Sequence, residues 1–218
     1  MIHRDYIMRL IEQMIAVLAR ILFNKEIRNY DQALVEIDNA LKAMFGWGTD
    51  FTTTLSAGDL LARLETVEGQ YWEKCLVAAE LINEEAQVFA LKNGHSPMIT
   101  DLYYKAFIFY FNAVQNAGDY PVGPYKYKLE QLAALLAQED LPEHKSRLCE
   151  YYEWCGNYAR AEDIFFELLE TDRASIIPHL NAFYQRLLTK SDAQLVKGNL
   201  PRHEVQDGIL ELKALKRK

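Results

Sequence analysis

The chain has few cysteines and no long apolar run, and each shortage excludes a class of protein. Three cysteines in 218 residues, none in a C-x-x-C spacing, give neither a disulfide framework nor a zinc ligand set. No stretch reaches the roughly 18 apolar residues that a membrane span needs. Charges near the N-terminus argue against a signal peptide. We therefore expect a cytoplasmic protein with buried, reduced thiols and no membrane span.

Recognisable catalytic and metal-binding motifs are also missing. The sequence has no Gly-rich phosphate loop, H-E-x-x-H, G-x-S-x-G or EF-hand pattern. None of its five histidines follows a glutamate by three residues, as in di-iron bundles. His144 and His203 each adjoin a glutamate, but neighbouring residues point apart on a helix, so we expect both at the surface. This pattern predicts no metal and no cofactor, and it indicates a protein that is not an enzyme.

The net charge of −7 is unevenly distributed along the chain. Residues 1–30 and residues 200–218 each carry five basic and three acidic side chains, which leaves −11 for the middle. An acidic body repels phosphate backbones, so nucleic acid is not an expected partner of this chain, apart from its short basic C-terminal tail.

The dominant period of the apolar residues is helical, and strand-like alternation is absent. We expect an all-α protein of about nine to ten helices with no β-sheet. We treat residues 1–218 as a single domain with a possible sub-boundary at 118–124, a Gly- and Pro-rich segment that we expect to be a loop. The expected helices are 5–24, 29–45, a short one from Ser56, 70–92, 96–116, 125–138, 142–155, 157–170, 176–190 and 201–216.

Two stretches 128 residues apart share an order of side chains. Residues 156–170 read GNYARAEDIFFELLE, and residues 28–42 read RNYDQALVEIDNALK. In each, an aromatic residue is followed by an alanine that lets two helix backbones approach closely, and then by bulky apolar residues. Each stretch is therefore predicted to be the second helix of a hairpin. The matching positions are Tyr30 and Tyr158, Ala33 and Ala161, Ile37 and Phe165, Ala40 and Leu168, and Leu41 and Leu169.

This order of residues resembles the tetratricopeptide (TPR) repeat, a helical pair of about 34 residues. Leu148, Cys149 and Tyr152 agree with the first helix of the motif, and Gly156 agrees with its turn, whereas Lys145 departs from it. The resemblance implies a TPR-like stack of antiparallel helical hairpins, an α-solenoid. The alternative is a bundle of unrelated amphipathic hairpins.

The opening DYIMRLIEQ, with the helix from Tyr30 to Leu41, is similar to a family of small uncharacterised proteins from Gram-positive bacteria. Those proteins share the N-terminal motif, a similar length and a TPR-like body. The resemblance implies no activity, substrate or catalytic residue.

In a TPR-like stack, the first helix of each hairpin lines a concave groove. TPR domains that clamp a free carboxylate present lysine and asparagine there, whereas helix 142–155 presents acids. We therefore expect a non-enzymatic interaction module whose protein or peptide ligand is neutral or basic and is not a free carboxylate. Solvated charge without a ligand is the alternative. The residues expected on this face are Glu143, Ser146, Glu150, Glu153 and Trp154.

Two further possibilities follow from other helices. Helix 5–24 has apolar residues on more than one side, which favours a homodimer formed through this helix. The aromatic helix around residues 103–111 forms either part of the core or one wall of an apolar pocket. A pocket there would favour a second function, that of a small-molecule or peptide sensor or an enzyme without a recognisable motif.

Overall fold

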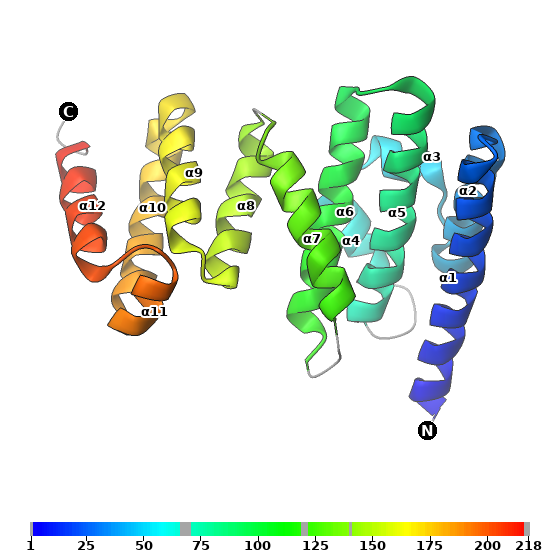
Figure 1. Ribbon diagram of the computed structural model, residues 1–218, viewed down its shortest axis with the longest axis horizontal. Coiled ribbons are helices and arrows are strands. Elements are labelled where there is room, and N and C mark those ends of the chain that lie inside the picture. Colours follow the sequence, from blue (N-terminus) through cyan, green and yellow to red (C-terminus); the bar gives the residue numbers. More distant parts are fainter. Residues whose placement is uncertain (1, 66–70, 119–121, 140, 216–218) are drawn as a thin grey trace. The chain divides into compact units, whose positions relative to one another are not determined.

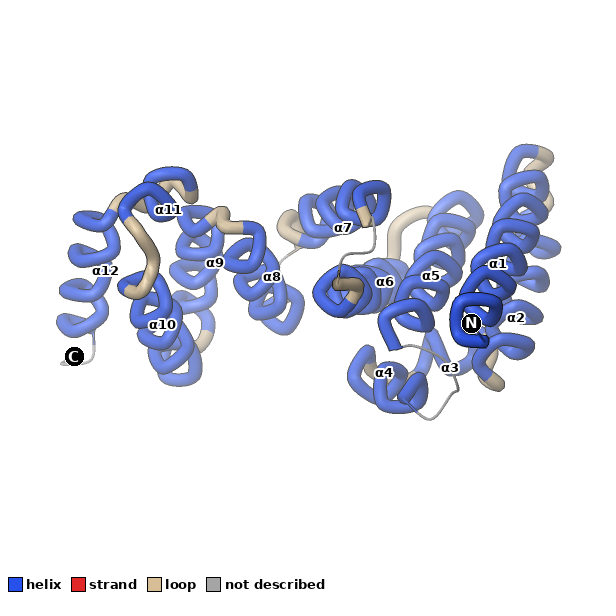
Figure 2. The backbone as a smooth tube through the Cα atoms, turned by 90° about the horizontal axis from the view of Figure 1, so that it is seen from below, coloured by secondary structure: helices blue, strands red, loops and turns tan. Residues whose placement is uncertain are grey.

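A computed structural model describes residues 2–65, 71–118, 122–139 and 141–215, with side chains placed from residue 12 to residue 214 of these ranges. The expectation of an all-α protein is confirmed, because the described residues form twelve helices and no strand (Figures 1 and 2). None of the helices in these ranges is both long and apolar enough to cross a membrane. The helices are α1 Ile2–Glu26, α2 Tyr30–Phe45, α3 Thr49–Thr54, α4 Ala57–Glu65, α5 Tyr71–Asn93, α6 Pro97–Asn116, α7 Gly123–Leu136, α8 Pro142–Cys155, α9 Tyr158–Thr171, α10 Arg173–Leu188, α11 Asp192–Lys197 and α12 Arg202–Leu215.

Two short helices and one helix start were not predicted. Helices α3 and α11 have six residues each, so less than two turns of apolar periodicity could reveal them. Helix α10 begins at Arg173 rather than at residue 176, because the Asp172 side chain caps this turn by accepting a hydrogen bond from the backbone N–H of Ser175 at 3.1 Å.

The expected loop at 118–124 is also shorter than predicted. Gly123 and Pro124 belong to the first turn of α7, where proline is tolerated because the N–H that it lacks has no partner within the helix. Residues 119–121 of the expected loop lie outside the described residues.

The chain divides into two compact units, residues 1–136 and 137–218. In the first unit, α1 pairs with α2 and α5 pairs with α6, and α7 packs on α6. Helices α1, α2, α4 and α6 all contact α5. Every residue of α5 from Glu73 to Ala86 is buried as a result.

Two acidic side chains on this buried helix form ion pairs with lysines from other helices of the unit. Lys25 of α1 donates a hydrogen bond to Glu84 at 2.7 Å, and Lys128 of α7 donates to Glu80 at 2.6 Å. Leaving either acid ionised and unpaired in the interior would cost several kcal/mol. The two pairs therefore hold α1 and α7 in place relative to α5.

A third buried acid of α5, Glu85, explains the position of α3. The hydroxyl of Thr52 in α3 lies 2.7 and 2.9 Å from the two carboxylate oxygens of Glu85, and Lys105 of α6 donates to the Thr52 carbonyl oxygen at 2.7 Å. Burial raises the pKa of Glu85 to about 8. The six-residue α3 is thus held in place by polar contacts that no periodic pattern contains.

In the second unit, α8 and α9 form a hairpin, α10 packs on α9, and α12 packs on α10. The apolar stripe predicted for α9 is confirmed, because its members are buried. Gly198, after α11, lies against the start of this helix: a Cβ atom there would come within 2.3 Å of the Tyr158 ring and 2.6 Å of the Gly156 carbonyl oxygen. The buried members of the stripe are Tyr158, Ala161, Ile164, Phe165, Leu168 and Leu169.

The turn between α8 and α9 recurs between α1 and α2. Gly156 has φ +76°, and Arg28, 128 residues earlier, has φ +59°. The next residue, Asn157 or Asn29, caps the second helix by accepting a hydrogen bond from the backbone N–H three residues later. The same asparagine donates its backbone N–H to the carbonyl oxygen five residues earlier, at 2.9 and 2.8 Å. The repeat predicted from the sequence therefore extends to the hydrogen bonds of the turn.

Two expectations about burial are wrong. His144 is buried rather than at the surface, because it lies on the same face of α8 as the buried Leu148 and Tyr151. Cys155, at the end of α8, is exposed, whereas the other two cysteines are buried as expected.

The first prediction concerns Glu73, whose carboxylate is buried without a hydrogen-bond partner among the described residues. Burial raises its pKa to about 7, so folding favours the protonated form. The protonated Glu73 carboxyl group stabilises the folded state fully below the ordinary carboxyl pKa. This contribution to the free energy of unfolding is lost as the pH rises through about 7. We expect the free energy of unfolding of Glu73→Gln, relative to the original chain, to rise by about 1–3 kcal/mol between about pH 5 and about pH 8.

Urea denaturation followed by far-UV circular dichroism at both pH values measures this difference. Glu65→Gln, which changes an exposed carboxyl group on α4, serves as the control and should show no such rise. A constant difference between Glu73→Gln and the original chain at the two pH values would contradict the assignment.

Candidate functional site

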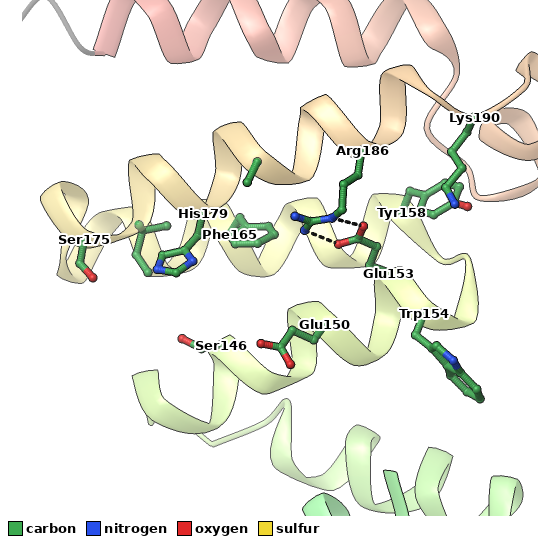
Figure 3. Close-up of a pocket in the computed structure, with 12 residues that line it drawn as sticks. Ser146, Glu150, Glu153, Trp154, Tyr158, Phe165, Ser175, His179, Arg186 and Lys190 are labelled. Carbon is green, nitrogen blue, oxygen red and sulfur yellow. Dashed lines mark hydrogen bonds and ion pairs between the residues drawn. The ribbon is translucent and has the colours of Figure 1, made fainter. Parts of the chain in front are cut away.

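A hollow of about 730 Å³ lies in the second unit between α8 and α10, with α9 behind it (Figure 3). We call it the α8–α10 groove. Its volume falls within the usual range of ligand pockets, roughly 300–1,000 Å³. Helix α9 contributes the buried rings of Tyr158 and Phe165. The other lining residues are Ser146, Glu150, Glu153 and Trp154 of α8, Ser175, Ile176, His179, Ala182 and Arg186 of α10, and Lys190 after α10.

Four of the five residues predicted for a concave face line this groove, namely Ser146, Glu150, Glu153 and Trp154. Their spacing of four, seven and eight residues places them on one face of α8. Glu143, in the first turn of the same helix, is exposed and is not among the lining residues. The structure therefore brings together all of the predicted set except its first member.

An ion pair crosses the groove from one helix to the other. Arg186 of α10 donates two hydrogen bonds to Glu153 of α8, one to each carboxylate oxygen, both at 2.7 Å (Figure 3). The hydrogen bonds that Arg186 donates to Glu153 raise the pKa of the guanidinium group. Glu150 is also paired, with Arg147 at 2.6 Å. Both acids of the groove are thus neutralised within the chain, which the sequence analysis did not predict.

The wall of the groove that α10 contributes was not predicted from the sequence. His179, Ala182 and Arg186 are spaced by three and seven residues, so they lie on one face of α10, and Lys190 follows just after the end of the helix. This spacing of His179, Arg186 and Lys190 was the available signal. The groove consequently has an acidic wall on α8 and a wall of basic residues on the α10 side.

Trp154 lies at one end of the groove. Its side chain is 43% exposed, and Figure 3 shows its indole ring pointing away from the ion pair. A partly exposed tryptophan at the end of the groove offers apolar surface to a ligand.

The groove also contains serine, histidine and glutamate, the residue types of a nucleophile, a base and an orienting acid. They are not joined in that way here. The Ser146 hydroxyl donates to the Pro142 carbonyl oxygen of its own helix at 3.3 Å. Within the described ranges, no hydrogen bond links His179 to Ser146, Ser175 or Glu150. The described residues also contain no group of three or more His, Cys, Asp or Glu side chains that could hold a metal ion.

A smaller pocket of about 280 Å³ lies in the first unit among α5, α6 and α7, and we call it the Tyr103 pocket. Asn83 on α5 is only 7% exposed and its side chain makes no hydrogen bond within the described part of the chain, but its amide atoms remain accessible to solvent. Burial raises the pKa of the Tyr103 hydroxyl, and the nearby Glu84 carboxylate adds to this effect. The pocket is lined by Asn83, Glu84, Gln87, Tyr103, Lys128, Gln131, Leu132 and Leu135.

Four of the other aromatic residues of α6 belong to the core. Phe107, Phe109, Tyr110 and Phe111 are at most 3% exposed, so only Tyr103 of the residues expected to form an aromatic surface lines this pocket. Most of the other lining residues are polar, so this is not the apolar pocket that was the alternative to a core position for this helix.

Comparison with known proteins places the chain in a family. No match was found among curated proteins or among solved structures. A family model described as a family of unknown function, DUF6483, matches residues 1–217. Because the match spans almost the whole sequence, the chain belongs to the DUF6483 family.

Proposed function

We propose that this chain is a non-enzymatic interaction module with TPR-like hairpins, and that it binds a neutral or basic peptide segment of another protein in the α8–α10 groove. The observation that carries the proposal is the groove itself, a space of about 730 Å³ that is lined by four residues of α8 and five of α10. The repeated hairpin turn supports the TPR-like interpretation. In both turns, which are 128 residues apart, a residue in the left-handed conformation is followed by an asparagine that caps the next helix.

The surface of the groove has the mixed character of a peptide site. Aromatic side chains such as Trp154, Tyr158 and Phe165 supply contact area at low entropic cost, and such residues carry much of the energy of many interfaces. Charged residues on both walls fix the orientation of a ligand without forming a closed cavity. An extended peptide can enter such an open groove from either end.

The second prediction tests this function by charge reversal. Peptides selected from a random library on the immobilised chain should bind the chain in solution, with affinity measured by fluorescence polarisation. Reversing Glu150 and Glu153 together to lysine should weaken binding by about tenfold or more, because the reversed charges repel a basic ligand. A tenfold loss of affinity corresponds to about 1.4 kcal/mol of binding free energy. Trp154→Ala should weaken binding as well.

Glu170→Lys is the matched control, because it reverses one exposed acid on α9 outside the groove. It should leave the affinity of the selected peptides unchanged. Selected peptides that bind the doubly reversed chain as tightly as the original one would overturn the proposed binding site.

Helix α1 supports a second interaction, with another copy of the chain. Met14, Val17 and Ile21 on one side of α1 are buried. On another side, Ile15 is 57% exposed and Phe23 is 58% exposed, and the side chains of residues 2–11 lie outside the described residues. An isolated helix face of this kind is covered efficiently by its own symmetry mate, because one apolar stripe then serves both partners.

The third prediction is that the original chain sediments as a dimer. The double variant Ile15→Lys and Phe23→Lys should sediment as a monomer, because lysines buried in the interface would oppose association. Sedimentation velocity measures the change. Val196→Lys, at an exposed valine of α11, is the control and should not affect the mass. A monomer in the original chain, or a dimer that persists in the double variant, would exclude association through this face.

The Tyr103 pocket favours a different function, that of a small-molecule sensor. The Asn83 amide and the half-buried Tyr103 hydroxyl both line a space of about 280 Å³. A small polar ligand can hydrogen-bond to both groups, because an amide and a phenol each donate and accept hydrogen bonds.

The fourth prediction discriminates this function from the peptide module. If the pocket serves a sensor, native mass spectrometry of protein isolated from its host should show a small-molecule adduct that the Asn83→Ala and Tyr103→Phe variants lose. The Glu150 and Glu153 charge reversal should leave this adduct in place. A bare polypeptide mass under conditions that preserve non-covalent complexes would count against the sensor.

A further inference from the structure

The two members of the ion pair across the α8–α10 groove differ in how strongly the protein holds them. The Glu153 side chain is 17% exposed, whereas the Arg186 side chain is 53% exposed. A largely buried carboxylate needs a cationic partner, since removing the partner leaves an uncompensated charge. A half-exposed guanidinium group can instead turn into water, where it is well solvated. The acid is therefore the fixed member of the pair, and the arginine is the replaceable one.

We infer that Arg186 occupies the position of a ligand's cation, and that the groove selects a peptide with an arginine or lysine side chain that replaces Arg186 at Glu153. This inference rests on the proposed peptide function and specifies the residue that is recognised. Glu153 accepts two parallel hydrogen bonds from Arg186 at 2.7 Å, and an incoming guanidinium group can reproduce this geometry. Arginine is therefore preferred over lysine, which cannot form the same fork.

Glu150 adds to the preference for a cation. It lies one turn before Glu153 on the same wall of the groove, and its side chain is 56% exposed. Its partner Arg147 is on the same helix and is itself 48% exposed. A cation that enters beside Glu153 therefore meets a second carboxylate, and the ion pair of that carboxylate with Arg147 is exposed and hence weak.

An anionic ligand is disfavoured by the same geometry. It would have to draw Arg186 or Lys190 to itself and leave Glu153 without its partner. It would also approach two carboxylates on the α8 wall, and like charges at close range repel. The basic residues of α10 are therefore not sufficient to bind an anion, because Arg186 is needed as the partner of Glu153.

The fifth prediction is that removing Arg186 and removing Glu153 change the affinity for an arginine peptide in opposite directions. The probe is the tightest arginine-containing peptide selected from a random library on the full chain, together with the same peptide carrying citrulline in place of that arginine. Arg186→Met should tighten binding of the arginine peptide by about three- to tenfold, because the internal competitor is gone. Glu153→Gln should weaken it by about tenfold or more. The citrulline peptide should bind weakly to all variants.

Net charge alone would favour the same order of affinities, so charge-matched controls are needed. Lys213→Met on α12 and Glu170→Gln on α9 make the same charge changes at exposed sites outside the groove. Both should leave the affinity unchanged. In addition, the side-chain Nε–H signal of Arg186 in NMR spectra should shift towards that of a solvated arginine when the peptide is added, which a purely structural ion pair would not show.

The outcomes separate this inference from the function on which it rests. Peptides that bind the groove but contain no arginine or lysine, or a weakened affinity in Arg186→Met, would overturn the replacement of Arg186 and leave the peptide module intact. Controls that change affinity as much as the groove variants would also overturn it. A library that yields no peptide sensitive to the Glu150 and Glu153 reversal would overturn both.

Discussion

The tight turn that joins paired helices is the constraint on which the arrangement of the candidate site depends. Gly156 takes a left-handed conformation, and Asn157 caps the next helix, so α9 must fold back directly along α8. Ala161 then allows the two backbones to approach closely. Because one face of α8 is committed to α9, its remaining face is available to line the groove. Arg28 adopts the same conformation at a strain cost that glycine avoids, which shows that the hairpin geometry requires this turn.

The two units satisfy their charged groups in different ways. In the first unit, Glu84 and Glu80 of α5 are buried and paired with Lys25 and Lys128 from other helices, so these charges fix helices in place. In the second unit, the pair of Glu153 and Arg186 lies in an open groove, and one of its members is half exposed. A pair of the first kind cannot be opened without a large loss of stability. A pair of the second kind can exchange partners at low cost, which makes it suitable for recognition.

Most of the helices could be predicted from the sequence because their apolar residues repeat every three to four positions over at least three turns. The two six-residue helices could not. Helix α3 is held by the contact of Thr52 with Glu85, which are 33 positions apart, and α11 by the capping box of Ser191 and Gln194. The first contact depends on which helices become neighbours, and no local pattern contains that information. His144 was misplaced for a related reason, since adjacency to a glutamate says nothing about which face of α8 is buried.

The candidate site also depends on contacts between distant segments, which a local sequence pattern cannot predict. The α8 face was predictable because Ser146, Glu150, Glu153 and Trp154 follow helical spacing within one segment. From that face alone the groove looks acidic. Its second wall comes from α10, and only the packing of α10 on α9 sets Arg186 opposite Glu153. The charge that a ligand meets is thus a property of two helices together, and it changes when the more exposed partner turns away. An acidic helix face can therefore favour cations even where the static groove is balanced in charge.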